Sequence, residues 1–130
     1  MNKVFYQSSL DRFIRSKKGR ALDLASGKET FVNLLLKNHW YVDSVDLKKK
    51  NFFHKKNYSF NQIDLEKTKL SKIRRKLALR KYDLIILFRF LHRPLLRIIP
   101  FLMKKNGLFF CETFMIQNGE GKLNTKKICC

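Results

Sequence analysis

Short apolar runs alternate along this chain with segments whose apolar residues recur at helical spacing, and this alternation restricts the fold more than any other feature. Nearly continuous apolar runs are typical of strands buried on both faces. Strands are predicted at residues 20–25, 41–46, 58–63, 82–88 and 107–113. Helices are predicted at residues 8–17, 28–38, 47–55, 67–80 and 91–105. Strands that alternate with helices pair in parallel through right-handed crossovers. We therefore expect an α/β fold, with an open, mostly parallel sheet, helices on both faces and the first helix over one sheet edge.

The length of 130 residues fits one domain, and 45% of the residues are hydrophobic and can form its core. This domain is expected to span residues 1–118, followed by a loose polar tail at 119–130. No apolar run approaches the ~20 residues of a membrane-spanning helix. The three cysteines, Cys111, Cys129 and Cys130, provide neither a disulfide framework nor a spaced metal-binding pair. We expect a protein of the reducing cytoplasm, with neither a membrane nor a metal ion as a partner.

The chain is strongly basic, with 29 Lys and Arg residues against 10 Asp and Glu residues and a formal net charge of +19. Such a surface attracts polyanions because binding releases their counterions. One interpretation is a surface selected to bind nucleic acid. The other is an AT-rich genome, which encodes Lys, Asn, Ile and Phe often. The 20 lysines are scattered along the sequence, and both interpretations stay open.

The turn after the first predicted strand combines an acidic residue with small ones. Asp23 lies within the strand, and Ala25, Ser26 and Gly27 let a ligand approach the backbone beside the free N–H groups of the next helix. Asp46 ends the second predicted strand, where a carboxylate can accept hydrogen bonds from ribose hydroxyls. These residues predict a site for a nucleoside cofactor. The turn lacks the G-x-G-x-x-G pattern of dinucleotide sites, which disfavours an NAD-dependent dehydrogenase.

The same turn matches a motif of a known family. Residues 22–27 read Leu-Asp-Leu-Ala-Ser-Gly, which resembles the hydrophobic-D-hydrophobic-(G/A)-(C/S)-G-x-G motif of class I S-adenosylmethionine-dependent methyltransferases. Glu29 stands where that family has its last glycine. Residues 82–96, YDLIILFRFLHRPLL, and 106–114, NGLFFCETF, are similar to a small bacterial branch of tellurite-resistance-type methyltransferases. The resemblance covers residues 19 to about 118.

The resemblance implies a Rossmann-like sheet of strand order 3-2-1-4-5. The family usually has two further strands after the fifth, and we expect this chain to depart from it by lacking them, because little sequence follows Phe114. The resemblance also implies S-adenosylmethionine as the cofactor, with seven binding residues: Asp23, Ala25, Ser26, Gly27, Asp46, Asp64 and Leu65. Asp23 and the small turn residues correspond to the methionine side of the cofactor, and Asp46 corresponds to the ribose. Asp64 and Leu65 correspond to the adenine.

Residues just past the fourth strand usually face the methyl group in this fold, which makes Arg89, His92 and Arg93 the catalytic candidates. An Arg can clamp a carboxylate or phosphate, and a His can remove a proton from the nucleophile. Equally, these residues can serve only to cap and solvate the helix that begins near Pro94. Glu112, at the end of the fifth strand, is open to both interpretations as well.

The function predicted from these residues is transfer of a methyl group from S-adenosylmethionine to an unidentified acceptor. The alternative is a catalytically inactive methyltransferase-like protein that binds RNA or a protein partner through its basic surface. Asp46→Ala distinguishes the two, because it removes cofactor binding in the first case and leaves salt-sensitive RNA affinity in the second.

The predicted fifth strand lies at the edge of the expected sheet and carries Leu108, Phe109 and Phe110. An apolar strand with an unpaired edge offers its backbone groups to another chain. We therefore expect a homodimer, or a complex with a partner chain, at this edge.

Overall fold

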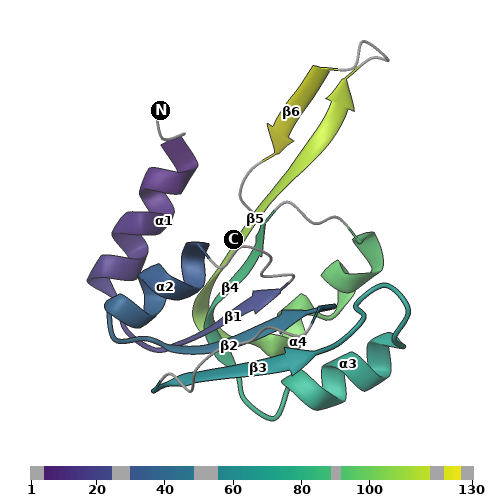
Figure 1. The fold of residues 1–130 in the computed structure, drawn as a ribbon, viewed down its shortest axis with the longest axis horizontal. Helices are drawn as coiled ribbons and strands as arrows, with labels where there is room; N and C mark the ends of the chain where they lie inside the picture. Colours follow the sequence, from purple (N-terminus) through teal and green to yellow (C-terminus); the bar gives the residue numbers. More distant parts are fainter. Residues whose placement is uncertain (1–4, 25–29, 49–55, 89–91, 118–121, 127–130) are drawn as a thin grey trace.

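The computed structural model describes residues 5–24, 30–48, 56–88, 92–117 and 122–126, and a single sheet runs through it. The strands are β1 (Arg20–Leu24), β2 (Tyr41–Asp46), β3 (Tyr58–Gln62), β4 (Tyr82–Phe88), β5 (Met103–Gln117) and β6 (Lys122–Lys126). Their order is β3-β2-β1-β4-β5-β6, and the first five pair in parallel. The predicted α/β class and the order 3-2-1-4-5 are confirmed (Figure 1).

Helices cover both faces of this sheet (Figure 1). They are α1 (Phe5–Ser16), α2 (Thr30–Lys37), α3 (Leu70–Leu77), the 3-10 helix η1 (Arg93–Arg97) and α4 (Ile99–Leu102). One apolar cluster joins α1 and α2 to the sheet, and a second joins α3, η1 and α4 to its other face. None of the helices in the described ranges is long and apolar enough to cross a bilayer. The predicted helix at 47–55 lies mostly outside the described residues.

Helix α1 packs on a face of the sheet, so the prediction that it covers a sheet edge is wrong. Leu10 and Ile14 are buried in the same cluster as Val42 and the other strand residues of that face. The indole Nε1 of the buried Trp40 donates a 3.0 Å hydrogen bond to the carbonyl oxygen of Ile14. Since this bond satisfies the polar atom of a buried Trp, it fixes the end of α1 above β2.

The predicted helix at 91–105 is instead two short helical segments followed by a strand. Pro94 lies in the first turn of η1, where a proline is tolerated. Pro100 cannot donate a backbone hydrogen bond to the preceding turn, so η1 ends and α4 begins at Ile99. Met103 pairs with Tyr82 and already belongs to β5. Pro100 thus divides a segment whose apolar spacing alone predicts one continuous helix.

The end of the chain differs from the prediction of a loose tail at 119–130. Residues 113–117 of β5 pair antiparallel with 122–126 of β6, and the two strands form an arm that projects beyond the sheet (Figure 1). The sheet therefore continues past its fifth strand. The polar composition of 122–126 hides this strand in the sequence, because pairing in such an arm needs backbone hydrogen bonds and no apolar face.

Asp83 joins three strands at the amino-terminal end of the sheet. Its Oδ2 accepts a 2.9 Å hydrogen bond from the backbone N–H of Arg20 and lies 3.2 Å from the ammonium group of Lys104. A Cβ added to Gly19 would collide with the Asp83 carboxylate. The absence of a side chain at Gly19 therefore lets β1 start directly against β4.

Candidate functional site

Two polar residues are buried side by side near the carboxyl ends of β1 and β2. Asp23 and Ser44 are register partners, with exposed fractions of 2% and 0%. Side chains alternate along a strand, so both point to the face that α2 covers, as Ala21 and Val42 do two residues earlier. Among the residues that the structure describes, the Ser44 hydroxyl has no hydrogen-bond partner. A buried hydroxyl without a partner is unfavourable, so its place beside Asp23 on the face that α2 covers favours a polar ligand or water there.

Asp46 is held at the tip of β2 by its neighbours. Its Oδ1 accepts a 2.7 Å hydrogen bond from the backbone N–H of Leu47, and its carbonyl oxygen accepts a 3.0 Å bond from the N–H of Ile63. The side-chain amide of Gln62 donates a 3.1 Å bond to the carbonyl oxygen of Leu47. These bonds fix a half-buried carboxylate at the edge where parallel strands end, which is the position that suits an acceptor for ribose hydroxyls.

Asp64 and Leu65 follow β3 at the same edge. Oδ1 of Asp64 accepts 3.1 Å hydrogen bonds from the backbone N–H groups of Glu66 and Lys67, and so caps the turn that leads to α3. Leu65 is 4% exposed and packs into the core under α3. Asp64 therefore has a structural role in this turn, and Leu65 contributes mainly to the core.

A small hollow opens between β3 and α3 beside Asp64. Its volume is about 140 Å³, and it is lined by Gln62, Ile63, Asp64, Thr68, Lys72, Ile73 and Lys76. Ligand pockets for molecules of cofactor size usually enclose roughly 300–1,000 Å³. The hollow is thus large enough for part of a nucleoside only.

Three aromatic rings that are not among the predicted site residues form a group near this edge. The rings of Phe31 and Phe88 meet edge to face at 5.1 Å, and Phe110 lies 6.0 Å from Phe31 and 6.5 Å from Phe88. Phe31 is in the first turn of α2, and Phe88 is the last residue of β4. The group therefore ties the start of α2 to the end of β4. The sequence holds a signal for this contact. Phe31 follows the start of a predicted helix and Phe88 ends a predicted strand, and a parallel sheet brings such positions to the same edge.

Some of the predicted site residues are not described by the structure, and one is described by its backbone alone. Ala25, Ser26, Gly27, Glu29 and Arg89 lie outside the described residues. The backbone of Glu112 pairs with Phe88 beside the end of β4, and its side chain is not described.

Two of the catalytic candidates fall within the described ranges. His92 is the half-buried N-cap residue of η1; its carbonyl oxygen accepts a 3.0 Å hydrogen bond from the N–H of Leu95, and its imidazole makes no capping bond. Arg93 is exposed in the first turn of η1. Both residues follow β4, at the same edge of the sheet as Asp46. The backbone of His92 thus performs the capping, which leaves its ring for other contacts.

Comparison with known proteins assigns the fold. No family model matches the chain, and no curated protein matches it. Among solved structures, a SAM-dependent methyltransferase from Agrobacterium tumefaciens is 18% identical with a TM-score of 0.65, covering 86% of this chain and 44% of that one. The 1,6-didemethyltoxoflavin-N1-methyltransferase of Burkholderia thailandensis, solved with S-adenosylhomocysteine bound, is 14% identical with a TM-score of 0.66, covering 94% and 60%.

A SAM-dependent methyltransferase from Archaeoglobus fulgidus is 18% identical with a TM-score of 0.62, covering 84% of this chain and 52% of that one. This chain thus has the class I methyltransferase fold and spans roughly half the length of these structural neighbours.

Proposed function

We propose that this protein binds S-adenosylmethionine and transfers its methyl group to an acceptor that the site does not identify. The observation that carries the proposal is the placement of Asp46 at the tip of β2, with Asp23 and Ser44 buried side by side one or two residues before the ends of β1 and β2. The similarity of residues 22–27 to the methyltransferase motif supports it, as does the bound S-adenosylhomocysteine of the Burkholderia neighbour.

The described residues fit this cofactor. The hydroxyl of Ser44, which has no hydrogen-bond partner among the described residues, lies beside Asp23 in the adjacent strand, and Asp46 offers a fixed carboxylate to ribose hydroxyls. Ala25, Ser26 and Gly27 are proposed to line the turn predicted to hold the methionine moiety. The hollow beside Asp64 has apolar walls from Ile63 and Ile73, and these suit one edge of an adenine ring.

When bound, the cofactor supplies a methyl group already activated on a sulfonium, so the protein needs mainly to hold the acceptor atom in line with it. We assign this positioning to Arg89, His92 and Arg93, which follow β4. The imidazole of His92, half-buried and not used in capping, is suited to take a proton from the acceptor. The arginines are suited to bind an anionic group on the acceptor.

The finer assignment, to the small bacterial tellurite-resistance-type branch, forms part of the same proposal. The segments 82–96 and 106–114 support it, because their sequences are similar to that branch. They contain β4, which leads to the catalytic candidates, and the part of β5 that pairs with it. The branch assignment does not identify the acceptor.

Isothermal titration calorimetry with S-adenosylhomocysteine tests the first step. We expect binding by the wild-type protein and none by Asp46→Ala. Asp11→Ala is the matched control, since it removes a carboxylate that pairs with Arg15 on α1, away from the site, and should bind as the wild type does. Absence of binding by the wild type at about millimolar ligand would overturn the proposal.

A further inference from the structure

Helix α3 presents a positive surface that the protein itself does not neutralise. Between Lys67 and Lys81 the sequence holds eight basic residues and no acidic one. The helix and its N-cap contribute five exposed basic side chains: Lys69, Lys72, Arg74, Arg75 and Lys76. Within the described part of the chain none of these five forms an ion pair, whereas the guanidinium of Arg80 lies 3.7 Å from the Asp43 carboxylate.

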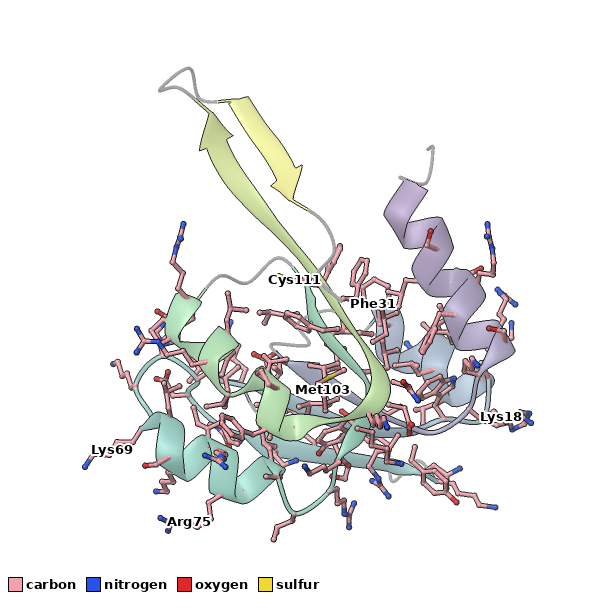
Figure 2. The ribbon with its side chains drawn as sticks, turned by 180° about the vertical axis from the view of Figure 1, so that it is seen from behind. Lys18, Phe31, Lys69, Arg75, Met103 and Cys111 are labelled. Carbon is pink, nitrogen blue, oxygen red and sulfur yellow. The ribbon has the colours of Figure 1, made fainter. Side chains whose placement is uncertain are left out.

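These side chains surround the solvent side of the helix. Ile73 and Leu77 point into the core, and Figure 2 shows Lys69 and Arg75 extending away from the sheet. Lys72 and Lys76, one turn apart, line the hollow at β3. Arg74 lies on the other flank, toward α4. The positive charge therefore extends across the whole exposed width of α3.

An exposed aromatic ring adjoins this charge. Phe101 of α4 is 47% exposed, and the guanidinium of Arg74 lies 3.7 Å from the centroid of its ring. Aromatic rings among basic side chains are typical of surfaces that bind single-stranded nucleic acid, because a base stacks on the ring while the cations contact the backbone.

We propose that α3 and Phe101 form a binding surface for single-stranded nucleic acid, in which Lys72 and Lys76 contact phosphates and a base stacks against Phe101. A run of positive charge without interleaved acidic residues matches a partner whose own charge is continuous, as in a polynucleotide backbone. A membrane surface fits less well, because Ile73 and Leu77 are buried and leave α3 no apolar face to insert. The proposal does not depend on methyl transfer, since this binding needs no cofactor.

Fluorescence anisotropy with a labelled oligouridylate of about 15 nucleotides, titrated over a series of salt concentrations, tests the proposal. The variant Lys72→Ala/Lys76→Ala removes two proposed phosphate contacts, so the slope of log K against log salt should fall in magnitude by about 1.4. The matched control is Arg12→Ala/Lys37→Ala, which lowers the net charge equally but changes exposed residues of α1 and α2 on the opposite face. This control should keep the wild-type slope.

A third variant, Phe101→Leu, keeps an apolar side chain and removes the ring. Affinity at fixed salt should fall roughly fivefold or more, with the slope unchanged, because stacking carries no counterion release. Circular dichroism checks that each variant is folded. Equal slopes in the two double variants would show an effect of net charge alone and overturn the proposal, as would wild-type affinity in Phe101→Leu. Loss of binding to phosphatidylserine vesicles in Lys72→Ala/Lys76→Ala, with oligouridylate binding intact, would assign the surface to a membrane and also overturn it.

Discussion

The hydroxyl of Tyr82 donates a 2.6 Å hydrogen bond to the carboxylate of Asp43, and both side chains are buried. Asp43 lies in β2 and Tyr82 at the start of β4, so the bond passes across β1. The guanidinium groups of Arg20 and Arg80 lie 3.5 Å and 3.7 Å from the other carboxylate oxygen. This group joins strands on the face of the sheet opposite Asp23 and Ser44, and it explains how an acidic residue is accommodated inside a strand.

The first prediction concerns this hydrogen bond. Tyr82→Phe leaves the buried Asp43 without its hydroxyl donor while the ring still fills the core. Since a hydrogen bond to a charged group contributes about 1.5–3 kcal/mol, the free energy of unfolding should fall by about that amount. Urea denaturation measures the loss. Tyr41→Phe is the control, because Tyr41 is 50% exposed and its variant should be as stable as the wild type.

The second prediction concerns pH. Burial raises the pKa of the Tyr82 hydroxyl well above its ordinary value, and the hydrogen bond and negative charge of Asp43 raise the pKa further. In the unfolded chain the hydroxyl loses its proton near pH ~10, while in the folded protein it keeps it. Stability from this residue is therefore complete below pH ~10 and is lost as pH rises, at about 1.4 kcal/mol per pH unit. Urea denaturation of wild type and Tyr82→Phe above that pH should show stabilities that converge, and parallel curves would contradict this.

The third prediction concerns the start of β1. Gly19→Ala places a methyl group against the Asp83 carboxylate, which must move away from the N–H of Arg20. The free energy of unfolding should fall by about 1–3 kcal/mol, from strain and a lost hydrogen bond. In an Asp83→Ala background the same change should cost less, because the collision partner is gone. Additive losses in this double-mutant cycle would show that the contact with Asp83 is not the cause.

The fourth prediction concerns the hydroxyl of Ser44, for which the described part of the chain offers no hydrogen-bond partner. Removing a buried hydroxyl that makes no hydrogen bond removes a desolvation cost, so Ser44→Ala should be as stable as the wild type or up to about 1 kcal/mol more stable. Thermal unfolding without ligand measures this. Ser59→Ala, at an exposed position of β3, should change nothing. A clear loss of stability in Ser44→Ala would mean that the hydroxyl has a partner in solution.

The fifth prediction depends on the proposed cofactor. Phe31→Ala removes the ring that ties the start of α2 to Phe88, so the first turn of α2 is less well positioned and the Kd for S-adenosylhomocysteine should rise by about tenfold. Phe13→Ala is the matched control, since Phe13 is a half-buried ring that packs 6.0 Å from Trp40, on α1. Calorimetry should show equal Kd values for this control and the wild type. Equal Kd values for all three proteins would contradict a positioning role of Phe31.

Much of the sheet is predictable from the sequence, because a strand buried on both faces must be apolar along its whole length. The run from Leu84 to Phe88 therefore identifies β4 without further information. The location of the candidate site is predictable as well. Asp23 and Asp46 stand near the ends of adjacent parallel strands, and parallel pairing brings those ends to one edge of the sheet.

The prolines show where local patterns mislead. The apolar spacing of residues 91–105 predicts one helix, but the missing N–H of Pro100 divides it. At residues 122–126 the local pattern misses an element instead of predicting one that is too long. Their polar composition predicts a tail, and only pairing with β5 makes them a strand.

What the sequence determines by itself is the set of elements and the edge at which polar groups gather, since periodicity and strand direction are local properties. Only the tertiary structure decides which distant groups meet. Asp43 is an unexplained acidic residue in a strand until the fold brings Tyr82, 39 positions away, to its carboxylate. The indole of Trp40 likewise finds its acceptor in Ile14, 26 positions earlier. Such partners are chosen by packing, because a buried polar group must find a hydrogen bond wherever the folded chain places one.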